Sequence, residues 1–271
     1  MESLKNRRYA DGMKLYEEII ERFNGRKLYI LIDEVQFITE WERVVNSLKK
    51  DIDCDIYLSG SNAYLLSNDI STLLTGRNTS MTVLPMSLPE LVELGMGDDP
   101  NDAFMTYLSF GALPVLRPFH SGDNRLKRIE DIKSDIILKD ICNRKEKIDS
   151  VKVRKVIDYL FSEIGNQISV EKISQQLNIS TSTASEYLNL IKESMLFIQA
   201  ERYDLKGKKI LKSQPKFYCT DIGMRATQPF PSENDFGRKL ENTVFLELLR
   251  RDKHVYIGNI GNYEVDFITI D

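Results

Sequence analysis

The chain has 271 residues, which at an ordinary domain size of about 150 residues predicts roughly two domains. A composition of 42% hydrophobic and 29% charged residues excludes a disordered tail, a collagen-like repeat and a small disulfide scaffold. The 37 Lys and Arg residues and 41 Asp and Glu residues give a net charge of −4, so no overall positive field attracts nucleic acid or anionic lipid. Any basic surface must be local.

Three widely spaced cysteines without a CxxC pair disfavour disulfides and thiolate metal sites, and they fit a reducing compartment. No stretch approaches the roughly 18 apolar residues that a membrane-spanning helix needs, and the opening residues are charged. We therefore expect a cytoplasmic protein with no membrane partner.

The first part of the chain alternates helix and strand. Apolar spacing predicts helices over 11–23 and 41–48. The unbroken apolar runs 28–32 and 56–58 predict strands, and continuous apolarity favours strands covered on both faces. This order predicts a parallel α/β sheet.

Helices dominate from about Met86 onward, and residues 122–145 form a polar connector with an isoleucine stripe that we expect to be core packing. Three closely spaced helices and a basic hairpin then predict a winged helix. Their expected limits are 151–164, 170–177 and 180–194 for the helices, and 196–200 and 209–211 for the strands.

The last segment predicts a helix over 236–251 and strands at 255–257 and 264–268, joined by a loop at 258–262. Asp221 is expected to cap the turn that follows it. His120 and His254 have no Cys or His at ligand spacing, so we expect surface or packing roles for both.

The strongest chemical signal is an apolar strand that ends in Asp33-Glu34. In nucleotide hydrolases such a strand delivers an acidic pair to the edge of the sheet, where one carboxylate holds Mg²⁺ and the other activates water. The alternative is a strand followed by a solvated turn. A second strand ends in the polar run Ser59-Gly60-Ser61-Asn62. About fifteen residues later, Arg77 carries a guanidinium group whose fixed fork of N–H donors is suited to binding a phosphate.

Five motifs in succession carry a resemblance that covers nearly the whole chain: Leu-Ile-Asp-Glu-Val-Gln, Leu-Ser-Gly-Ser-Asn-Ala, Leu-Leu-Thr-Gly-Arg, Leu-Pro-Met-Ser-Leu-Pro-Glu-Leu and Phe-Gly-Ala-Leu-Pro. The chain resembles the predicted AAA-superfamily ATPases of bacteria and archaea. In that family an ATPase module precedes a C-terminal domain of unknown function that contains a winged helix and a nuclease-like fold.

The resemblance implies an α/β fold in four parts. These are a partial P-loop NTPase sheet of AAA type, a helical connector, a winged helix and a truncated restriction-endonuclease-like α/β segment, over residues 1–118, 119–147, 148–215 and 216–271. It implies ATP and Mg²⁺ as cofactors of the intact family.

The same resemblance assigns roles to individual residues. Asp33 and Glu34 would be the Walker B pair, with Asp33 on the metal. Asn62 would be the sensor residue, and Arg77 a candidate arginine finger acting on a neighbouring subunit's nucleotide.

One part of the family pattern is missing, because no GxxxxGK[ST] string occurs in the 271 residues. That loop supplies most of the hold on the β and γ phosphates. The absent strand, loop and helix would need about 30 more residues, so we expect the chain to start inside the fold. We also expect it not to hydrolyse ATP alone, and to self-associate through unpaired strand edges of the ATPase module.

Local basic charge makes the winged helix a candidate DNA-binding region. Residues 201–217 hold six basic and two acidic side chains, a net of +4 that could bind phosphates. The residues expected to contact DNA are Thr181, Ser182, Lys206, Lys208, Lys209 and Lys212. The alternative is a packing module, because the second helix of the pair carries no arginine for reading bases.

Glu241 and Asp266 resemble the beginning of a nuclease core and are candidate metal ligands; the alternative is an ordinary pair of surface acids.

The resemblance therefore implies an AAA-family, ATPase-like protein that associates with DNA through the winged helix, and the missing loop predicts that this chain is inactive in ATP hydrolysis alone. The other hypothesis is a non-enzymatic module that binds DNA or protein.

Overall fold

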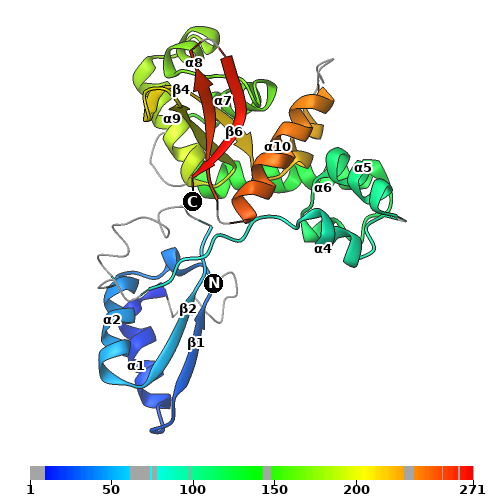
Figure 1. Cartoon of the computed structure of the whole chain (residues 1–271). Coiled ribbons are helices and arrows are strands. Elements are labelled where there is room, and N and C mark those ends of the chain that lie inside the picture. The colour runs from blue at the N-terminus through cyan, green and yellow to red at the C-terminus, as the bar shows by residue number, and fades with distance from the viewer. Residues whose placement is uncertain are drawn as a thin grey trace. The chain divides into compact units, whose positions relative to one another are not determined.

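A computed structural model describes residues 10–61, 74, 78–97, 99–142, 148–228, 235–251, 253–261 and 263–270. The chain divides into two compact units, residues 1–82 and 83–271. Figure 1 shows the helices and strands of each unit. Among the described residues, no helix has the length and apolarity needed to cross a bilayer.

The first unit is a small α/β unit with a parallel sheet, as predicted. Strands β1 and β2 pair from Leu28 opposite Cys54 to Ile32 opposite Leu58. Its elements in chain order are α1 (Gly12–Arg22), β1 (Leu28–Ile32), the 3₁₀ helix η2 (Val35–Phe37), α2 (Trp41–Asp51) and β2 (Cys54–Leu58).

Helices α1 and α2 cover one face of this sheet, where Ile30 and Ile56 join an apolar cluster around Leu48. The other face leaves Leu31 77% and Tyr57 59% exposed. The prediction that both faces are covered is therefore wrong for the described residues. Unbroken apolarity does not identify burial on both faces, because large apolar side chains also occur on protein surfaces.

The second unit begins with helices that have polar caps. Ser87 and Glu90 form a capping box on α4, and Asp99, Ser121 and Ser180 each accept backbone hydrogen bonds at later helix starts. The helices are α4 (Leu88–Glu93), α5 (Pro100–Phe110), η4 (Pro114–Leu116), α6 (Gly122–Asp135), the π-helix η5 (Ile136–Ile141), α7 (Ser150–Ser162), α8 (Val170–Leu177), α9 (Thr181–Glu193), η7 (Ile222–Thr227) and α10 (Asp235–Arg250).

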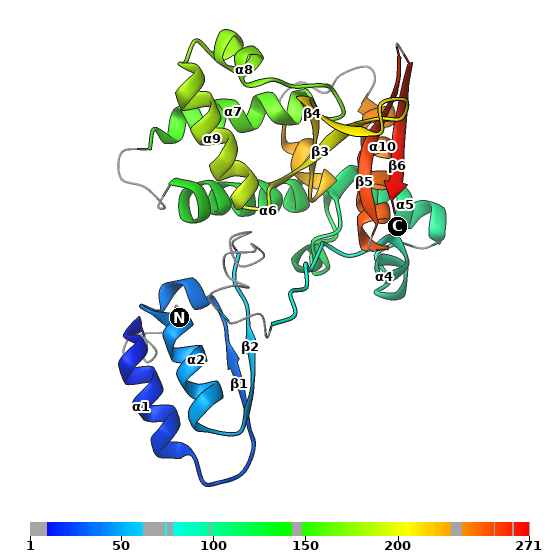
Figure 2. The same ribbon diagram turned by 60° about the vertical axis from the view of Figure 1, so that its left-hand side comes forward.

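A four-stranded sheet in the order β4-β3-β5-β6 joins the hairpin to the end of the chain. Strand β3 pairs antiparallel with β4 and parallel with β5, so one sheet spans the boundary expected near residue 215 (Figure 2). The strands are β3 (Phe197–Asp204), β4 (Lys209–Cys219), β5 (His254–Ile260) and β6 (Tyr263–Ile270).

The loop expected at 258–262 is shorter than predicted, because β5 continues to Ile260. The reversal comes at Gly261, whose φ of +63° is a conformation that glycine adopts without steric cost.

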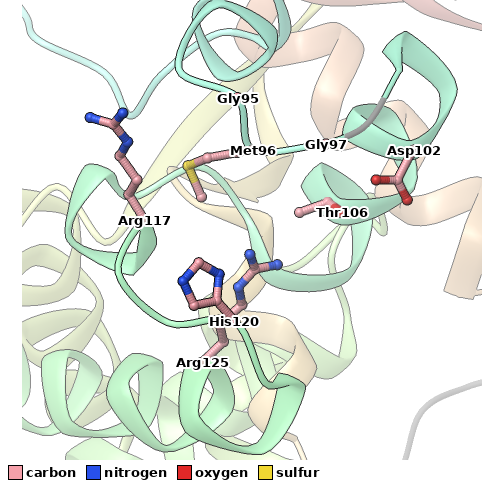
Figure 3. Close-up of a pocket in the computed structure, with 8 residues that line it drawn as sticks. All are labelled: Gly95, Met96, Gly97, Asp102, Thr106, Arg117, His120 and Arg125. Atoms are coloured by element: carbon pink, nitrogen blue, oxygen red, sulfur yellow. The ribbon is translucent and has the colours of Figure 1, made fainter.

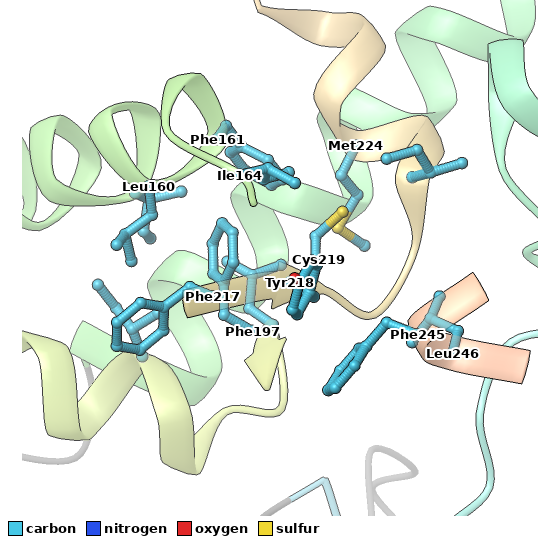
Figure 4. Packing of buried hydrophobic residues seen from close by; sticks show 14 of the residues in the cluster. Leu160, Phe161, Ile164, Phe197, Phe217, Tyr218, Cys219, Met224, Phe245 and Leu246 are labelled. Carbon is cyan, nitrogen blue, oxygen red and sulfur yellow. The ribbon is translucent and has the colours of Figure 1, made fainter. Parts of the chain in front are cut away.

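The core of this unit is continuous and rich in aromatic side chains (Figure 4). The rings of Phe161 and Phe197 lie 4.7 Å apart, and those of Tyr218 and Phe245 lie 4.3 Å apart. Ile137 and Ile141 of the connector are fully buried in the same cluster, which confirms that the isoleucine stripe packs in the core.

Candidate functional site

The carboxyl ends of β1 and β2 form one edge of the parallel sheet. The backbone ties the two strand ends together, because Ser59 N–H donates to Ile32 O at 2.9 Å and Val35 N–H donates to Ser59 O at 3.0 Å. Asp33 and Glu34 follow β1 at this edge, so the structure places the acidic pair where the sequence predicted it.

Asp33 lies exposed at this edge, and its carboxylate accepts a hydrogen bond from the Ser59 hydroxyl. The neighbouring strand therefore fixes the orientation of the carboxylate. Because the Ser59 oxygen also accepts from Glu34 N–H, at 3.3 Å, one serine connects both acidic positions.

Glu34 is half-buried in an unusual backbone conformation, with φ 54° and ψ 53° in the left-handed region. Non-glycine residues rarely occupy this region, and such residues cluster at functional sites. The Glu34 carboxylate accepts hydrogen bonds from the Gln36 amide and from the Ser61 hydroxyl, the latter at 3.5 Å. A short turn and the end of β2 thus hold this side chain in place.

The donor set at this edge fits magnesium. Among the described residues, no group of three or more His, Cys, Asp or Glu side chains could hold a metal ion. Mg²⁺ does not require such a group, because it keeps several waters and takes one or two carboxylates together with substrate phosphates. Asp33 would supply the carboxylate, and the Ser59 hydroxyl is a second hard oxygen beside it.

Two further residues of the predicted site, Asn62 and Arg77, lie outside the described residues. Their placement beside Asp33 stays a prediction.

The C-terminal acids are not brought together by any contact in the described part of the chain. The Glu241 carboxylate on α10 accepts hydrogen bonds from Tyr218 Oη at 2.6 Å and Lys216 Nζ at 3.1 Å. Lys216 also pairs with Glu264 on β6 at 2.6 Å. Lys216 therefore links Glu241 on α10 to Glu264 on β6. Asp266 lies on the same strand as Glu264, and its side chain is exposed.

Lys216 changes the charge count of the hairpin. It is only 5% exposed and pairs with two carboxylates, so it is not available to DNA phosphates. Without it, residues 201–217 carry five basic and two acidic side chains, a net of +3. The expectation that all six basic residues contribute to one surface is wrong for this lysine.

The other residues expected to contact DNA occupy two places. Thr181 and Ser182 are exposed in the first turn of α9. Lys206 and Lys208 are exposed in the turn between β3 and β4, and Lys209 is exposed at the start of β4. The side chain of Lys212 lies outside the described part of the structure.

Sequence reasoning missed two arrangements. Lys216 was counted as a surface charge, and only its position facing α10 and β6 reveals the buried pairing. His120 is exposed, as expected, but no sequence pattern indicates that it lines a pocket together with two arginines. Both arrangements bring together residues from separate elements, and spacing within one element carries no signal for that.

Comparisons with known proteins agree with the geometry of the first unit. Residues 1–92 match a family described as AAA domain, and residues 101–233 match a domain of unknown function, DUF8612. No solved structure matches the chain.

The similar curated proteins are uncharacterized. One from Haemophilus influenzae is 32% identical over 281 residues, covering 99% of this chain and 70% of that protein. Two from Methanocaldococcus jannaschii are 29% and 24% identical, covering 88% and 79% of this chain. The chain spans only 58% and 49% of the lengths of those two relatives. The chain belongs to the family of the Haemophilus influenzae protein, and it has an AAA-like first part followed by a match to a domain of unknown function.

Proposed function

We propose that the edge formed by Asp33, Glu34 and Ser59 is the magnesium- and water-handling half of an ATP-hydrolysing site. The observation that carries the proposal is the position of the acidic pair at the carboxyl ends of two adjacent parallel strands, with Ser59 bonded to Asp33. Ligands of open α/β sheets bind at this edge. The match to an AAA domain supports the same assignment.

Asp33 and Glu34 have different tasks in this proposal. Asp33 is exposed and would hold Mg²⁺, which would supply positive charge to neutralise the developing phosphate charge. Glu34 is held by Gln36 and Ser61, and its carboxylate orients the attacking water and accepts its proton. The Ser59 hydroxyl bonds both the Asp33 carboxylate and the Glu34 backbone N–H.

This chain does not hydrolyse ATP by itself in our proposal. The 271 residues contain no GxxxxGK[ST] string, and that loop and its lysine supply most of the contacts to the β and γ phosphates. Asn62 and Arg77 are the proposed sensor and arginine finger of the complete site. Purified chain incubated with Mg²⁺ and ATP should release phosphate at the background rate. Turnover that Glu34→Gln abolishes would contradict this part of the proposal.

The metal role is tested by ligand-dependent thermal unfolding. A ligand that binds only the folded state raises the midpoint Tm, so millimolar Mg²⁺ should raise the Tm of the wild-type chain. The shift should disappear in Asp33→Asn. It should persist in Asp53→Asn, because Asp53 is an exposed acid at the opposite end of β2. Equal shifts in both variants would overturn the assignment.

We also propose that residues 150–219 bind DNA as a winged helix. The arrangement that supports this is α7, α8 and α9 followed by the β3–β4 hairpin, with Gln167 bridging to β4 at Lys216. Helix α9 presents Thr181 and Ser182, and the hairpin presents three exposed lysines. A module that contacts protein instead would leave those lysines without an effect on DNA affinity.

The DNA proposal is tested by the salt dependence of binding to duplex DNA. Replacing Lys206, Lys208 and Lys209 with alanine should weaken binding and reduce the slope of log K against log salt by about 2–3. A charge-matched control replaces Lys14, Arg26 and Lys50, which are exposed in the first unit. If both triple variants bind DNA alike, the hairpin is not a DNA contact.

A further inference from the structure

A small pocket with basic walls lies in the second unit, apart from the hairpin and from the C-terminal acids. Its volume is about 230 Å³, and its walls come from the loop after α4, from α5, from the end of η4 and from the start of α6. Pockets for drug-sized ligands measure roughly 300–1,000 Å³. The space therefore suits one small group.

Three basic side chains reach this pocket from a short stretch of chain. Arg117 follows η4, His120 precedes the Ser121 cap of α6, and Arg125 lies in the first turns of that helix. In Figure 3 the His120 ring and the Arg125 guanidinium lie next to each other and face the loop that carries Met96. Arg117 lies to one side of them in the same view, at the rim of the pocket, and its guanidinium points away from theirs.

The fold fixes Arg125 and leaves Arg117 unpaired. Arg125 Nε donates to Phe119 O at 2.7 Å, and its guanidinium lies 5.3 Å from the centre of the Phe110 ring. These contacts hold the planar group without using its two terminal nitrogens. Within the described residues, the Arg117 guanidinium makes no hydrogen bond or ion pair, so its donors remain available to a ligand.

The opposite wall depends on close backbone packing. A Cβ on Gly97 would lie 2.5 Å from Ala103 Cα, so only glycine lets this loop approach α5 so closely. That approach brings the loop to the face of α5 that carries Asp102 and Thr106. The pocket thus has a hydroxyl on this wall and one carboxylate at its edge.

The charge of the lining is positive. Two arginines and one aspartate give a net of +1 with His120 neutral. Guanidinium groups present a fixed fork of donors that matches the oxygens of phosphate. A carboxylate in the lining weakens the attraction for an anion without reversing it. The lining therefore favours binding of an anion. Asp102 should weaken that binding, and removing its charge tests this expectation.

We propose that this pocket binds a phosphate group, with Arg125 and His120 as its inner donors, Thr106 as a further donor and Arg117 as an exposed donor at its rim. The group belongs either to free phosphate or to the backbone of a nucleic acid. Both sources offer the same tetrahedral oxyanion. This pocket shares no residue with the proposed magnesium edge, so the phosphate proposal can be tested independently of the magnesium assignment.

Titration calorimetry of the full chain with inorganic phosphate, at constant ionic strength, tests the proposal. Arg117→Ala should weaken binding at least about tenfold, the effect of losing one hydrogen bond to a charged group. This variant should fold normally, since the side chain is exposed and has no partner in the described structure. Asp102→Asn should strengthen binding.

The matched control is Arg128→Ala, which removes the same residue type from α6 but does not line the pocket. It should leave phosphate affinity unchanged. If free phosphate binds too weakly to measure, binding to a short DNA duplex decides the source. Affinity lost in Arg117→Ala, with Arg128→Ala unaffected, assigns the pocket to backbone phosphate. Equal behaviour of the two arginine variants with both ligands would overturn the proposal.

Discussion

The carboxylate of Asp221 accepts a hydrogen bond from the backbone N–H of Ala112 at 2.8 Å, although 109 residues separate the two in sequence. It also accepts from Gly223 N–H at 2.9 Å, which confirms the expected capping role. The first bond joins the end of α5 to η7. One buried carboxylate therefore connects the helical start of the second unit to the segment that follows its β3–β4 hairpin.

This contact predicts a pH-dependent stability. Burial raises the pKa of Asp221 to about 6 from an ordinary 3.8, despite opposing hydrogen bonds from Ala112 and Gly223. Between those values the folded state binds more protons than the unfolded state, so the free energy of unfolding falls as pH rises. The fall should be roughly 2 kcal/mol between pH 4 and pH 6. Denaturant titrations of wild type and Asp221→Asn should differ by this slope. Parallel curves would contradict it.

Gly111 should tolerate no side chain at all. Its φ is +74°, and a Cβ there would lie 1.8 Å from the Asp221 Oδ1 atom. Gly111→Ala should lower the free energy of unfolding by about 2 kcal/mol or more, since backbone strain and overpacking add together. Gly237→Ala is the control, because a Cβ at Gly237 meets nothing within 4 Å. It should leave stability unchanged or raise it by up to about 1 kcal/mol.

The buried Lys216 should matter for stability rather than for DNA. Lys216→Met leaves Glu241 and Glu264 without their shared cation, and it should cost about 1–3 kcal/mol because both carboxylates are partly exposed. Lys209→Met on the exposed hairpin should change stability by less than about 0.5 kcal/mol. Adding Glu241→Gln and Glu264→Gln to Lys216→Met should recover part of the loss. No recovery would show that packing, not charge, is the cause.

The same pairing predicts an acid dependence of opposite sign to that of Asp221. Burial raises the pKa of Glu264, but hydrogen bonds from Lys216 and Gln167 outweigh it and hold the pKa below its ordinary 4.5. The folded state then binds fewer protons, so this stabilisation is present above pH 4.5 and is lost as the pH falls below it. The difference between wild type and Glu264→Gln should shrink on acidification. A constant difference would contradict the assignment.

Much of the fold follows from sequence pattern. The periods of the helices and the apolar runs at β1 and β2 carry local signals, and the structure confirms those elements. The position of Asp33-Glu34 after β1 was predictable for the same reason. A strand, a helix and a second strand in succession favour one parallel arrangement.

The remainder depends on contacts between distant segments. Nothing near Lys216 in sequence distinguishes a buried lysine from the surface lysines of the hairpin, because its two carboxylates come from α10 and β6. The pairing of β3 with β5 could not be predicted from sequence either, because β4 and α10 lie between these two strands in the chain. The apolar neighbours of Leu31 in sequence predict that it is buried. In the described structure, the face of the β1–β2 sheet that carries Leu31 is exposed.

The backbone of Glu34 offers a test of whether the site stores strain. Alanine and glycine both remove the carboxylate, and they differ in the cost of the left-handed conformation that Glu34 adopts. Glu34→Gly should therefore be more stable than Glu34→Ala by about 1 kcal/mol, measured by denaturant unfolding. At an ordinary helical or extended position alanine would be the more stable of the two. That order at Glu34 would refute the strained conformation.

The most direct test of the proposed magnesium edge is paramagnetic broadening of backbone amide signals by Mn²⁺, used as a probe for Mg²⁺. The account predicts selective loss of the signals from Glu34, Val35 and Ser59, which surround the Asp33 carboxylate. The broadening should vanish in Asp33→Asn and remain in Asp53→Asn. Broadening that spreads evenly over exposed acids, or that persists in Asp33→Asn, would contradict the account.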